Sequence, residues 1–435
     1  METVKINSAN IDREIARIRK TASPFDPETV AATAAIVEQV RKKGDSALFS
    51  LTKKFDRASI SARTVEVSGS EAKAAMAKVP KGVMKDLKTA RRRIEDYQRK
   101  KMPRAAEHRD AYGNRLGWLV RPLDRVGIYI PGGKAAYPST VLMTAVPAKV
   151  AGVRETVMTT PCPGGRLNPE VIAAASVAGV DRIFKIGGAQ AVAAMAFGTK
   201  SVPRADKIVG PGNIYVTIAK KLVYGEVDID MMAGPSEVFV IADGSCPARW
   251  VASDLLAQAE HDEMATPTLA ATSASYARQV KDELMKMARG IERSKIAAAS
   301  IKSRGKIFIT SSLKQAVRIS NAVAPEHLEL CVKSPRSLLP LIRHAGAVFL
   351  GSRSTEPFGD YVCGSSHVLP TGGAARFSSP LSASDFVKTP STAELTAKGF
   401  DKLADTVINL ARSEGLTAHA LSVTTRRGGE KKRGA

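Results

Sequence analysis

Between residues 126 and 210, short apolar segments alternate with glycine-rich turns and alanine-rich helical stretches. The apolar segments are VGIYI (126–130), ETVMTT (155–160), DRIFKI (181–186) and DKIVG (206–210). The repeated order of strand, glycine turn and helix is typical of a parallel sheet with crossover helices. Such sheets bind ligands at the carboxyl ends of their strands, where these turns lie. The turns bring backbone N–H groups close to a ligand, an arrangement that suits a pyrophosphate.

The usual dinucleotide fingerprint G-x-G-x-x-G is absent, and VGPGN offers only G-x-G. A non-standard nucleotide site is therefore permitted by the pattern. A second alternating set follows residue 236, in which TLAAT, KIFIT and AVFLG predict strands with helices between them.

We therefore predict an α/β protein with two Rossmann-like domains that contain parallel sheets. The predicted regions are a mainly helical one (1–106), a nucleotide-binding domain (107–236), a second α/β domain with the catalytic residues (237–381) and a helical segment with a disordered basic tail (382–435). In the first region, one helical stripe is predicted to be buried, and Pro103 to end that helix. The stripe consists of Val83, Leu87, Ala90, Ile94 and Tyr97.

Composition excludes several classes of protein. The chain has no run of eighteen apolar residues, and its charged N-terminus does not resemble a secretory signal. The four cysteines are far apart and form no C-x-x-C, which favours a reducing compartment and a cytoplasmic location. Cys162, in PCPGG, could be a thiol nucleophile for an aldehyde, but a small buried or loop cysteine is the simpler interpretation.

The formal net charge is +23, and residues 81–104 carry ten Lys/Arg against three Asp/Glu. Nucleic-acid binding would be the interpretation if aromatic residues were interleaved with this basic run. Aromatic residues are only 5% of the chain, and no nucleic-acid-binding signature is present. A basic background or an anionic ligand explains the charge better.

Three segments carry candidate chemistry. NAVAPEHLEL (321–330) places Glu326 and His327 after a proline, which predicts that they lie at the start of a helix. In DLLAQAEHDE (254–263), Gln258 and His261 are three residues apart and would share a helix face. His261 is a metal-ligand candidate there, whereas glutamine is a poor zinc ligand.

The other candidates lie nearer the C-terminus. Asp360 falls in a glycine-rich stretch, GDYVCGSSH, which predicts a turn-rich loop. There it could ligate a metal, orient a histidine or form an Asx turn. His419 follows Glu414 near the end of the last predicted helix, where a histidine usually compensates the helix dipole. Together, these residues fit a metal with nitrogen and oxygen ligands, such as zinc.

Longer segments carry a more specific signal. IYIPGGKAAYPSTVLMTAVPAKVAG, IGGAQAVAAMAFGT, DKIVGPGNIYVT, DMMAGPSEVFVIAD, DLLAQAEHD, APEHLEL and GDYVCGSSHVLPTGG closely resemble histidinol dehydrogenases, in the same order along the chain. The resemblance implies an NAD-dependent, zinc-dependent homodimer that oxidises L-histidinol to L-histidine through the aldehyde. It also implies that the Rossmann-like domains are incomplete, which accounts for the missing fingerprint.

The resemblance assigns roles to individual residues. Zinc ligands would be Gln258, His261, Asp360 and His419, and the last of these would come from the neighbouring subunit. The same four residues would contact the substrate, together with Ser236, His327 and Glu414. Tyr129, Gln190 and Asn213 would contact NAD.

The resemblance gives Glu326 and His327 proton-transfer roles, because alcohol oxidation needs a base and the aldehyde must be hydrated before a second hydride leaves. His327 suits the first task, and Glu326 suits activation of the water. The sequence departs from the family at Ser365-Ser366, where an asparagine often precedes the histidine. Two alternatives remain: a related zinc- and NAD-dependent enzyme that acts on another small polar alcohol, and a basic nucleic-acid-binding protein.

Overall fold

The computed structural model describes residues 1–19, 26–132 and 137–429. The chain divides into two compact units, one of residues 1–101 with 123–386 and one of residues 102–122 with 387–435. None of the helices in the described part is long and apolar enough to cross a membrane. The boundaries of the four predicted regions stay predictions.

A five-stranded parallel sheet forms from the segments with which the sequence analysis began, and it confirms the predicted parallel arrangement. Its order is β7 (Arg182–Phe184), β6 (Glu155–Thr159), β5 (Arg125–Tyr129), β8 (Lys207–Val209) and β9 (Asp228–Ile229). The chain builds outward from β5 on one side through β6 and β7, and then crosses to β8 on the other side. The switch point of the sheet therefore lies between β5 and β8.

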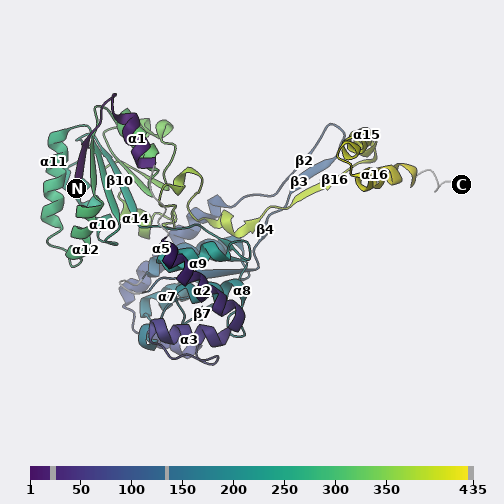
Figure 1. The fold of residues 1–435 in the computed structure, drawn as a ribbon, viewed down its shortest axis with the longest axis horizontal. Helices are drawn as coiled ribbons and strands as arrows, with labels where there is room; N and C mark the ends of the chain where they lie inside the picture. Colours follow the sequence, from purple (N-terminus) through teal and green to yellow (C-terminus); the bar gives the residue numbers. More distant parts are fainter. Residues whose placement is uncertain (20–25, 133–136, 430–435) are drawn as a thin grey trace. The chain divides into compact units, whose positions relative to one another are not determined.

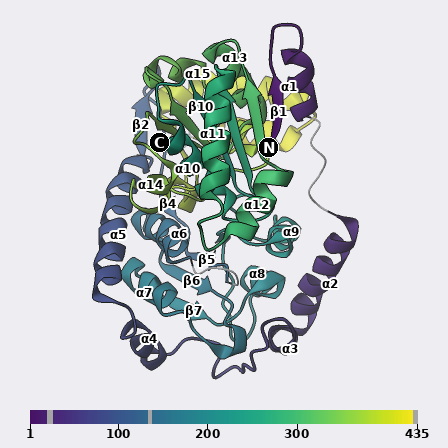
Figure 2. The ribbon, with the colours of Figure 1, turned by 90° about the vertical axis from the view of Figure 1, so that its left-hand side faces the viewer.

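Helices cover both faces of this sheet (Figure 2). On one face lie α2 (Pro27–Lys43), α3 (Asp45–Asp56), α8 (Gly188–Phe197) and α9 (Ile214–Val223). The other face is covered by α6 (Pro138–Ala151) and α7 (Pro169–Ala178), with α4 (Gly69–Met76) and α5 (Lys81–Lys101) packed outside them. Because both faces are covered, the strands are almost continuously apolar.

The first unit also contains a six-stranded parallel sheet. Its order is β1 (Glu2–Lys5), β12 (Lys306–Ile309), β11 (Thr266–Ala271), β10 (Glu237–Ala242), β13 (His327–Cys331) and β14 (Ala347–Leu350). The predicted strands TLAAT, KIFIT and AVFLG are confirmed, whereas β1, β10 and β13 were not predicted. The short N-terminal strand β1 pairs with β12, far along the sequence.

Three helices line one face of the six-stranded sheet, and Figure 1 shows them beside β10. They are α10 (Ala248–Ala259), α11 (Ala274–Met287) and α12 (Ser294–Ser303). The opposite face packs against α1 (Ile11–Arg19) and α13 (Leu313–Val323). A short helix, α14 (Glu356–Tyr361), follows the edge strand β14.

The second unit is small. An antiparallel sheet joins β16 (Ser391–Glu394), β3 (Arg115–Trp118) and β2 (Ala106–Arg109), and β15 (Val387–Lys388) pairs with β4 (Arg121–Pro122). Two helices, α15 (Ala397–Ser413) and α16 (Thr417–Gly429), complete it. Residues 391–394 were predicted as helix, but they form a strand because β3 is available for pairing. The last part of the predicted disordered tail, residues 430–435, lies outside the described residues.

The predicted helical stripe in the basic region is nearly correct. Leu87, Ala90 and Ile94 are buried on α5, which ends at Lys101 as Pro103 predicts. The prediction for Tyr97 is wrong, because its side chain is 41% exposed while the neighbouring Gln98 is buried. Gln98 takes the inner position because its amide oxygen accepts a hydrogen bond from the backbone N–H of Ala383.

A buried ion pair fixes the turn after β8. Gly210 adopts a φ of +115°, and a Cβ there would lie 2.1 Å from the carbonyl oxygen of Tyr129. Asp230 accepts a hydrogen bond from the Gly210 N–H at 2.7 Å, and Lys220 donates to the Gly210 carbonyl at 3.0 Å. The Lys220 and Asp230 side chains form a salt bridge and are 3% and 1% exposed.

We expect Lys220→Met to lower the free energy of unfolding by about 3–5 kcal/mol, because it leaves the Asp230 carboxylate buried without its cation. Urea denaturation measures this change. Combining it with Asp230→Asn should recover part of the loss, and Lys200→Met, at an exposed lysine, should change stability by less than about 0.5 kcal/mol. A loss for Lys220→Met no larger than for Lys200→Met would contradict the role of the pair.

Candidate active site

His327 is the first residue of β13, and its side chain is buried. Its Nδ1 lies 3.0 Å from the backbone carbonyl oxygen of Glu237. A carbonyl oxygen can only accept, so Nδ1 carries the proton and Nε2 carries a lone pair. Among the described residues Nε2 has no hydrogen-bond partner, and the Asp360 carboxylate lies 3.8 Å from it. Burial lowers the pKa of His327 to about 4, so the imidazole is a neutral base.

Glu326 lies beside this imidazole. Its Oε2 accepts a hydrogen bond from the Glu237 N–H at 2.8 Å and lies 3.6 Å from Nδ1 of His327. Burial raises the pKa of Glu326 well above its ordinary value, and burial raises the pKa of Glu237 to about 7. The pKa of Glu237 therefore lies in the range in which proton transfer operates near neutral pH, and the pKa of Glu326 is shifted in the same direction.

The predicted helix start for this pair is wrong. The preceding helix α13 ends at Val323, and Ala324 adopts a left-handed φ of +53° directly before Pro325. The apolar segment that follows pairs with β10 on one side and β14 on the other, so strand formation satisfies its backbone groups. Glu326 and His327 thus lie at the entrance of a central strand.

Three of the four predicted metal ligands gather around Glu356. The ligand atoms of His261, Glu356 and Asp360 all lie within 4.8 Å of one another. With its amide oriented to satisfy both partners, Gln258 donates to the two oxygens of Glu356 at 3.2 and 3.1 Å. Imidazole, carboxylate and amide groups form a donor set that suits a borderline divalent cation such as zinc.

The local structure around these ligands differs from the prediction. Helix α10 ends at Ala259, so His261 lies in the turn after the helix, where its N–H donates to the Gln258 carbonyl at 3.2 Å. Asp360 lies on helix α14, not in a loop, four residues after Glu356. That spacing puts both carboxylates on one side of the helix.

His367 completes the buried polar cluster. Its Nδ1 donates to the backbone carbonyl of Asp360 at 3.1 Å, so its Nε2 accepts from the Thr140 hydroxyl, also at 3.1 Å. Burial lowers the pKa of His367 to about 4, and burial also lowers the pKa of His261. His367 therefore holds the backbone of α14 at Asp360 and links it to α6.

The residues predicted to contact a nucleotide lie at the carboxyl edge of the five-stranded sheet. Tyr129 ends β5, and its hydroxyl oxygen accepts from the Gly188 N–H at the start of α8 at 3.0 Å. Gln190 is buried in the first turn of α8, and its Nε2 has no partner in the described chain. Asn213 caps α9 after β8 and is exposed. Two of these positions flank the β5/β8 switch point, where ligands bind in such sheets.

The catalytic candidates do not lie at the carboxyl ends of parallel strands, where ligands usually bind in such sheets. Glu237 and His327 begin β10 and β13, and Gln258 and His261 precede β11, so this site lies at the amino ends of the six-stranded sheet. Ser236 belongs to the same edge, is half-buried, and its carbonyl accepts from the Thr266 N–H at 2.9 Å.

Glu414 and His419 belong to the second unit. Glu414 caps the end of α15, and both side chains are exposed. The predicted position of His419 at the end of the last helix is wrong: a separate helix, α16, begins at Thr417, and His419 lies in its first turn. Gly415 adopts a left-handed φ of +74° between α15 and α16, so the chain does not continue as one helix.

Sequence reasoning missed Glu237, Glu356 and His367 as members of the site. The spacing of Glu356 four residues before Asp360 was a signal for a shared helix face. His367 stood at the end of GDYVCGSSH, beside Asp360, but the sequence assigned it no role. Cys162 is buried and burial raises the pKa of its thiol to about 12, which favours the buried-cysteine interpretation over a nucleophile.

The fold and site together indicate an α/β oxidoreductase, with a sheet switch point of the kind at which ligands bind and a buried neutral base beside two carboxyl groups. Comparison with known proteins identifies the family. The histidinol dehydrogenase family model matches residues 20–427. The chain belongs to the histidinol dehydrogenase family and is an oxidoreductase.

Individual relatives agree. Histidinol dehydrogenase of Syntrophotalea carbinolica is 52% identical over 92% of this chain and 93% of its own length. Histidinol dehydrogenase of Geobacter sulfurreducens is 47% identical over 98% of this chain and 100% of its own length. The crystal structure of histidinol dehydrogenase from Elizabethkingia anophelis is 34% identical, covers 99% of each chain and superposes with a TM-score of 0.93.

The Thr140–His367 contact gives a test of the site. We expect Thr140→Val to lower kcat by about tenfold, because Nε2 of His367 loses its hydrogen-bond donor and the hold of the ring on the Asp360 backbone weakens. Steady-state kinetics measure the effect. Thr140→Ser keeps the hydroxyl and should keep most of the activity; equal losses in both variants would show that the hydrogen bond is not the cause.

Proposed function

We propose that the protein oxidises L-histidinol to L-histidine through L-histidinaldehyde, in two successive NAD-dependent steps that need one zinc ion per subunit. Its family membership supports the substrate, and the buried lone pair of His327 Nε2 is the observation that carries the mechanism. NAD, when bound, accepts the hydride in each step. Zinc, when bound, orients the imidazole and amine of the substrate.

The residues of the chain move the protons. His327 Nε2 accepts the hydroxyl proton as the alcohol carbon loses hydride. The Nδ1–H keeps its hydrogen bond to the Glu237 carbonyl oxygen, which holds the ring in one orientation. Glu326, in its ionised form, activates the water that hydrates the aldehyde. The donor set of Gln258, His261 and Asp360 fits zinc, and we assign these residues as its ligands within one subunit.

We further propose that the protein is a homodimer in which His419 of one chain completes the zinc site of the other and Glu414 contacts the substrate. Both residues are exposed on a small separate unit, as a group that reaches a second chain must be. Tyr129, Gln190 and Asn213 are assigned to NAD, and Ser236 to the substrate. The cytoplasmic location stays a prediction.

Stoichiometry tests the reaction. We expect two NADH per histidinol consumed, and loss of activity on chelation with recovery on addition of zinc. Absorbance at the NADH band, with metal analysis of the same sample, measures both. One NADH per histidinol, or higher activity on another small polar alcohol in a substrate panel, would contradict the proposal.

The pKa of Glu326 gives a test of its role. Because burial raises this pKa, the ionised base is absent at low pH and the rate should rise as pH increases through the folded-state value. Glu326→Gln should lower kcat by about 10²–10⁴-fold and remove this acid limb. An unchanged limb in Glu326→Gln would assign the titration to another group.

Mixing inactive variants tests the shared site. Asp360→Asn and His419→Asn remove ligands that we place on different chains of one site. Each variant should be inactive alone, whereas mixed dimers should regain activity, because one of their two sites contains neither substitution. Absence of recovery in dimers shown to have exchanged subunits would place both ligands on one chain.

A further inference from the structure

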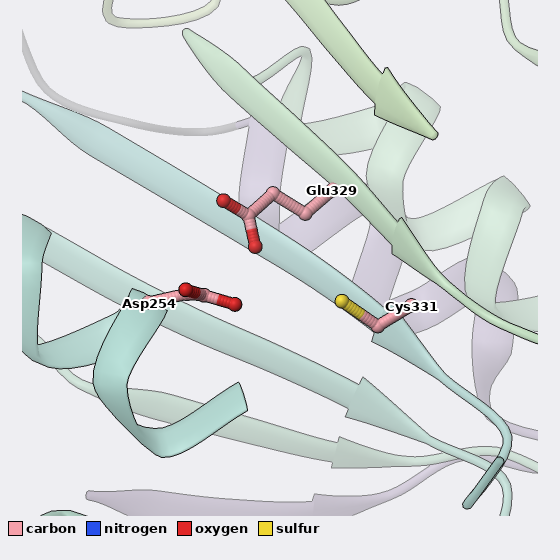
Figure 3. Close-up of side chains that lie close together, drawn as sticks. All are labelled: Asp254, Glu329 and Cys331. Carbon is pink, nitrogen blue, oxygen red and sulfur yellow. The ribbon is translucent and has the colours of Figure 1, made fainter. Parts of the chain in front are cut away.

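A second layer of acidic groups lies behind the candidate active site. Glu329 follows His327 by two residues on β13, so the two side chains share one face of the strand. Asp254 precedes Gln258 by four residues on α10, so these two share one face of the helix. Figure 3 shows Asp254 and Glu329 directed toward one another, with Cys331 beside them.

This layer is fully enclosed. Asp254, Glu329 and Cys331 are 5%, 1% and 3% exposed. No part of the proposed mechanism uses them, and buried carboxyl groups are costly unless their hydrogen bonds are satisfied. Their retention in the core therefore needs a physical reason.

Glu329 has a direct connection to the site. Its Oε1 accepts a hydrogen bond from the backbone N–H of Glu356 at 2.8 Å. Glu356 is the first residue of α14, where a backbone N–H has no acceptor within the helix. The contact fixes the start of the helix that carries both Glu356 and Asp360.

Asp254 lies beside Glu329. A carboxyl oxygen of Asp254 and one of Glu329 lie within 4.8 Å of one another. Oε2 of Glu329 has no hydrogen-bond partner among the described residues. Two buried carboxyl groups this close do not readily ionise together, so one of them favours its protonated form.

The same three elements thus meet in two layers. In the upper layer, Gln258 contacts Glu356, and His327 faces Asp360. In the lower layer, carboxyl oxygens of Asp254 and Glu329 lie within 4.8 Å of one another, and Glu329 accepts a hydrogen bond from the backbone of α14.

We propose that Glu329, backed by Asp254, is a positioning residue for the reaction: it sets the place of α14 and therefore the place of Asp360 and Glu356 relative to His327. Its relevance to catalysis rests on the proposed function. Its effect on the position of α14 does not, and the experiment separates the two.

Four variants test the proposal. Glu329→Leu keeps the approximate volume and removes the acceptor, and Glu329→Met is a second acceptor-free variant should the first not fold. Glu329→Gln keeps a side-chain oxygen that can accept from the Glu356 N–H, and Asp254→Asn leaves Glu329 unchanged. In each variant an amide of nearly the same shape replaces one carboxyl group and the other carboxyl group remains. Thr52→Val is the matched control, since it removes a buried hydrogen bond in α3, from the Thr52 hydroxyl to the Leu48 carbonyl.

The measurements are zinc affinity by chelator competition, kcat and KM for histidinol, thermal unfolding and the crystal structure of each variant. We expect Glu329→Leu to lower zinc affinity and kcat by about 10–100-fold and to displace α14. Glu329→Gln and Asp254→Asn should stay within about threefold of the unchanged protein. Thr52→Val should lower stability without changing zinc affinity or kcat.

Three outcomes would overturn the proposal. The first is an acceptor-free variant that is only less stable, with zinc affinity, kcat and α14 unchanged. The second is equal impairment of Glu329→Gln and Glu329→Leu, which would require the carboxylate itself. The third is a second metal ion per chain that is lost in Asp254→Asn and Glu329→Gln, which would make the cluster a metal site. If the protein does not oxidise histidinol, the proposed function fails, but the position of α14 in the variant structures still decides the inference.

Discussion

The hydrogen bond from His327 Nδ1 to the carbonyl oxygen of Glu237 is the interaction on which the site depends. It joins the first residues of two paired strands, β10 and β13, so the sheet itself holds the imidazole. It also fixes the tautomer, because only one ring nitrogen can donate to a carbonyl. The basic nitrogen is thereby directed toward Asp360 and held in a buried place where the ring stays neutral.

The rest of the site is built by elements that converge on this strand entrance. Helix α10 brings Gln258, and the turn after it brings His261, while α14 returns from β14 with Glu356 and Asp360. Their mutual contacts place nitrogen and oxygen donors within reach of one ion. The supporting contacts come from backbone groups and buried side chains, and this explains why a site with several acidic groups stays ordered inside the core.

Much of this architecture could be predicted from the sequence. The glycine turns of residues 126–210 predicted the parallel sheet, because a turn of this kind commits the chain to a crossover. The strand β1 could not be predicted, since four polar and apolar residues at a terminus acquire strand structure only by pairing with β12. The helix start at Glu326 was a wrong inference for a related reason: Pro325 fits a helix and a strand entrance equally, and the pairing of β13 on both sides decided between them.

The site was predicted unevenly. The resemblance named Gln258, which donor chemistry alone had rejected, and the structure brings it to the carboxylate of Glu356. Glu237 could not be found from its own segment, because its contribution to His327 is a backbone carbonyl, and every residue has one. We propose that His419 comes from a second chain, and the pattern of a single sequence does not reveal contacts between chains.

The tautomer of His327 tests the account most directly. In chelated protein labelled with ¹⁵N-histidine, and with Thr140→Val and His327→Asn spectra for assignment, we expect His327 to be neutral at about pH 6 with its proton on Nδ1. A proton on Nε2, or an imidazolium signal at that pH, would contradict the assignment of Nε2 as the base.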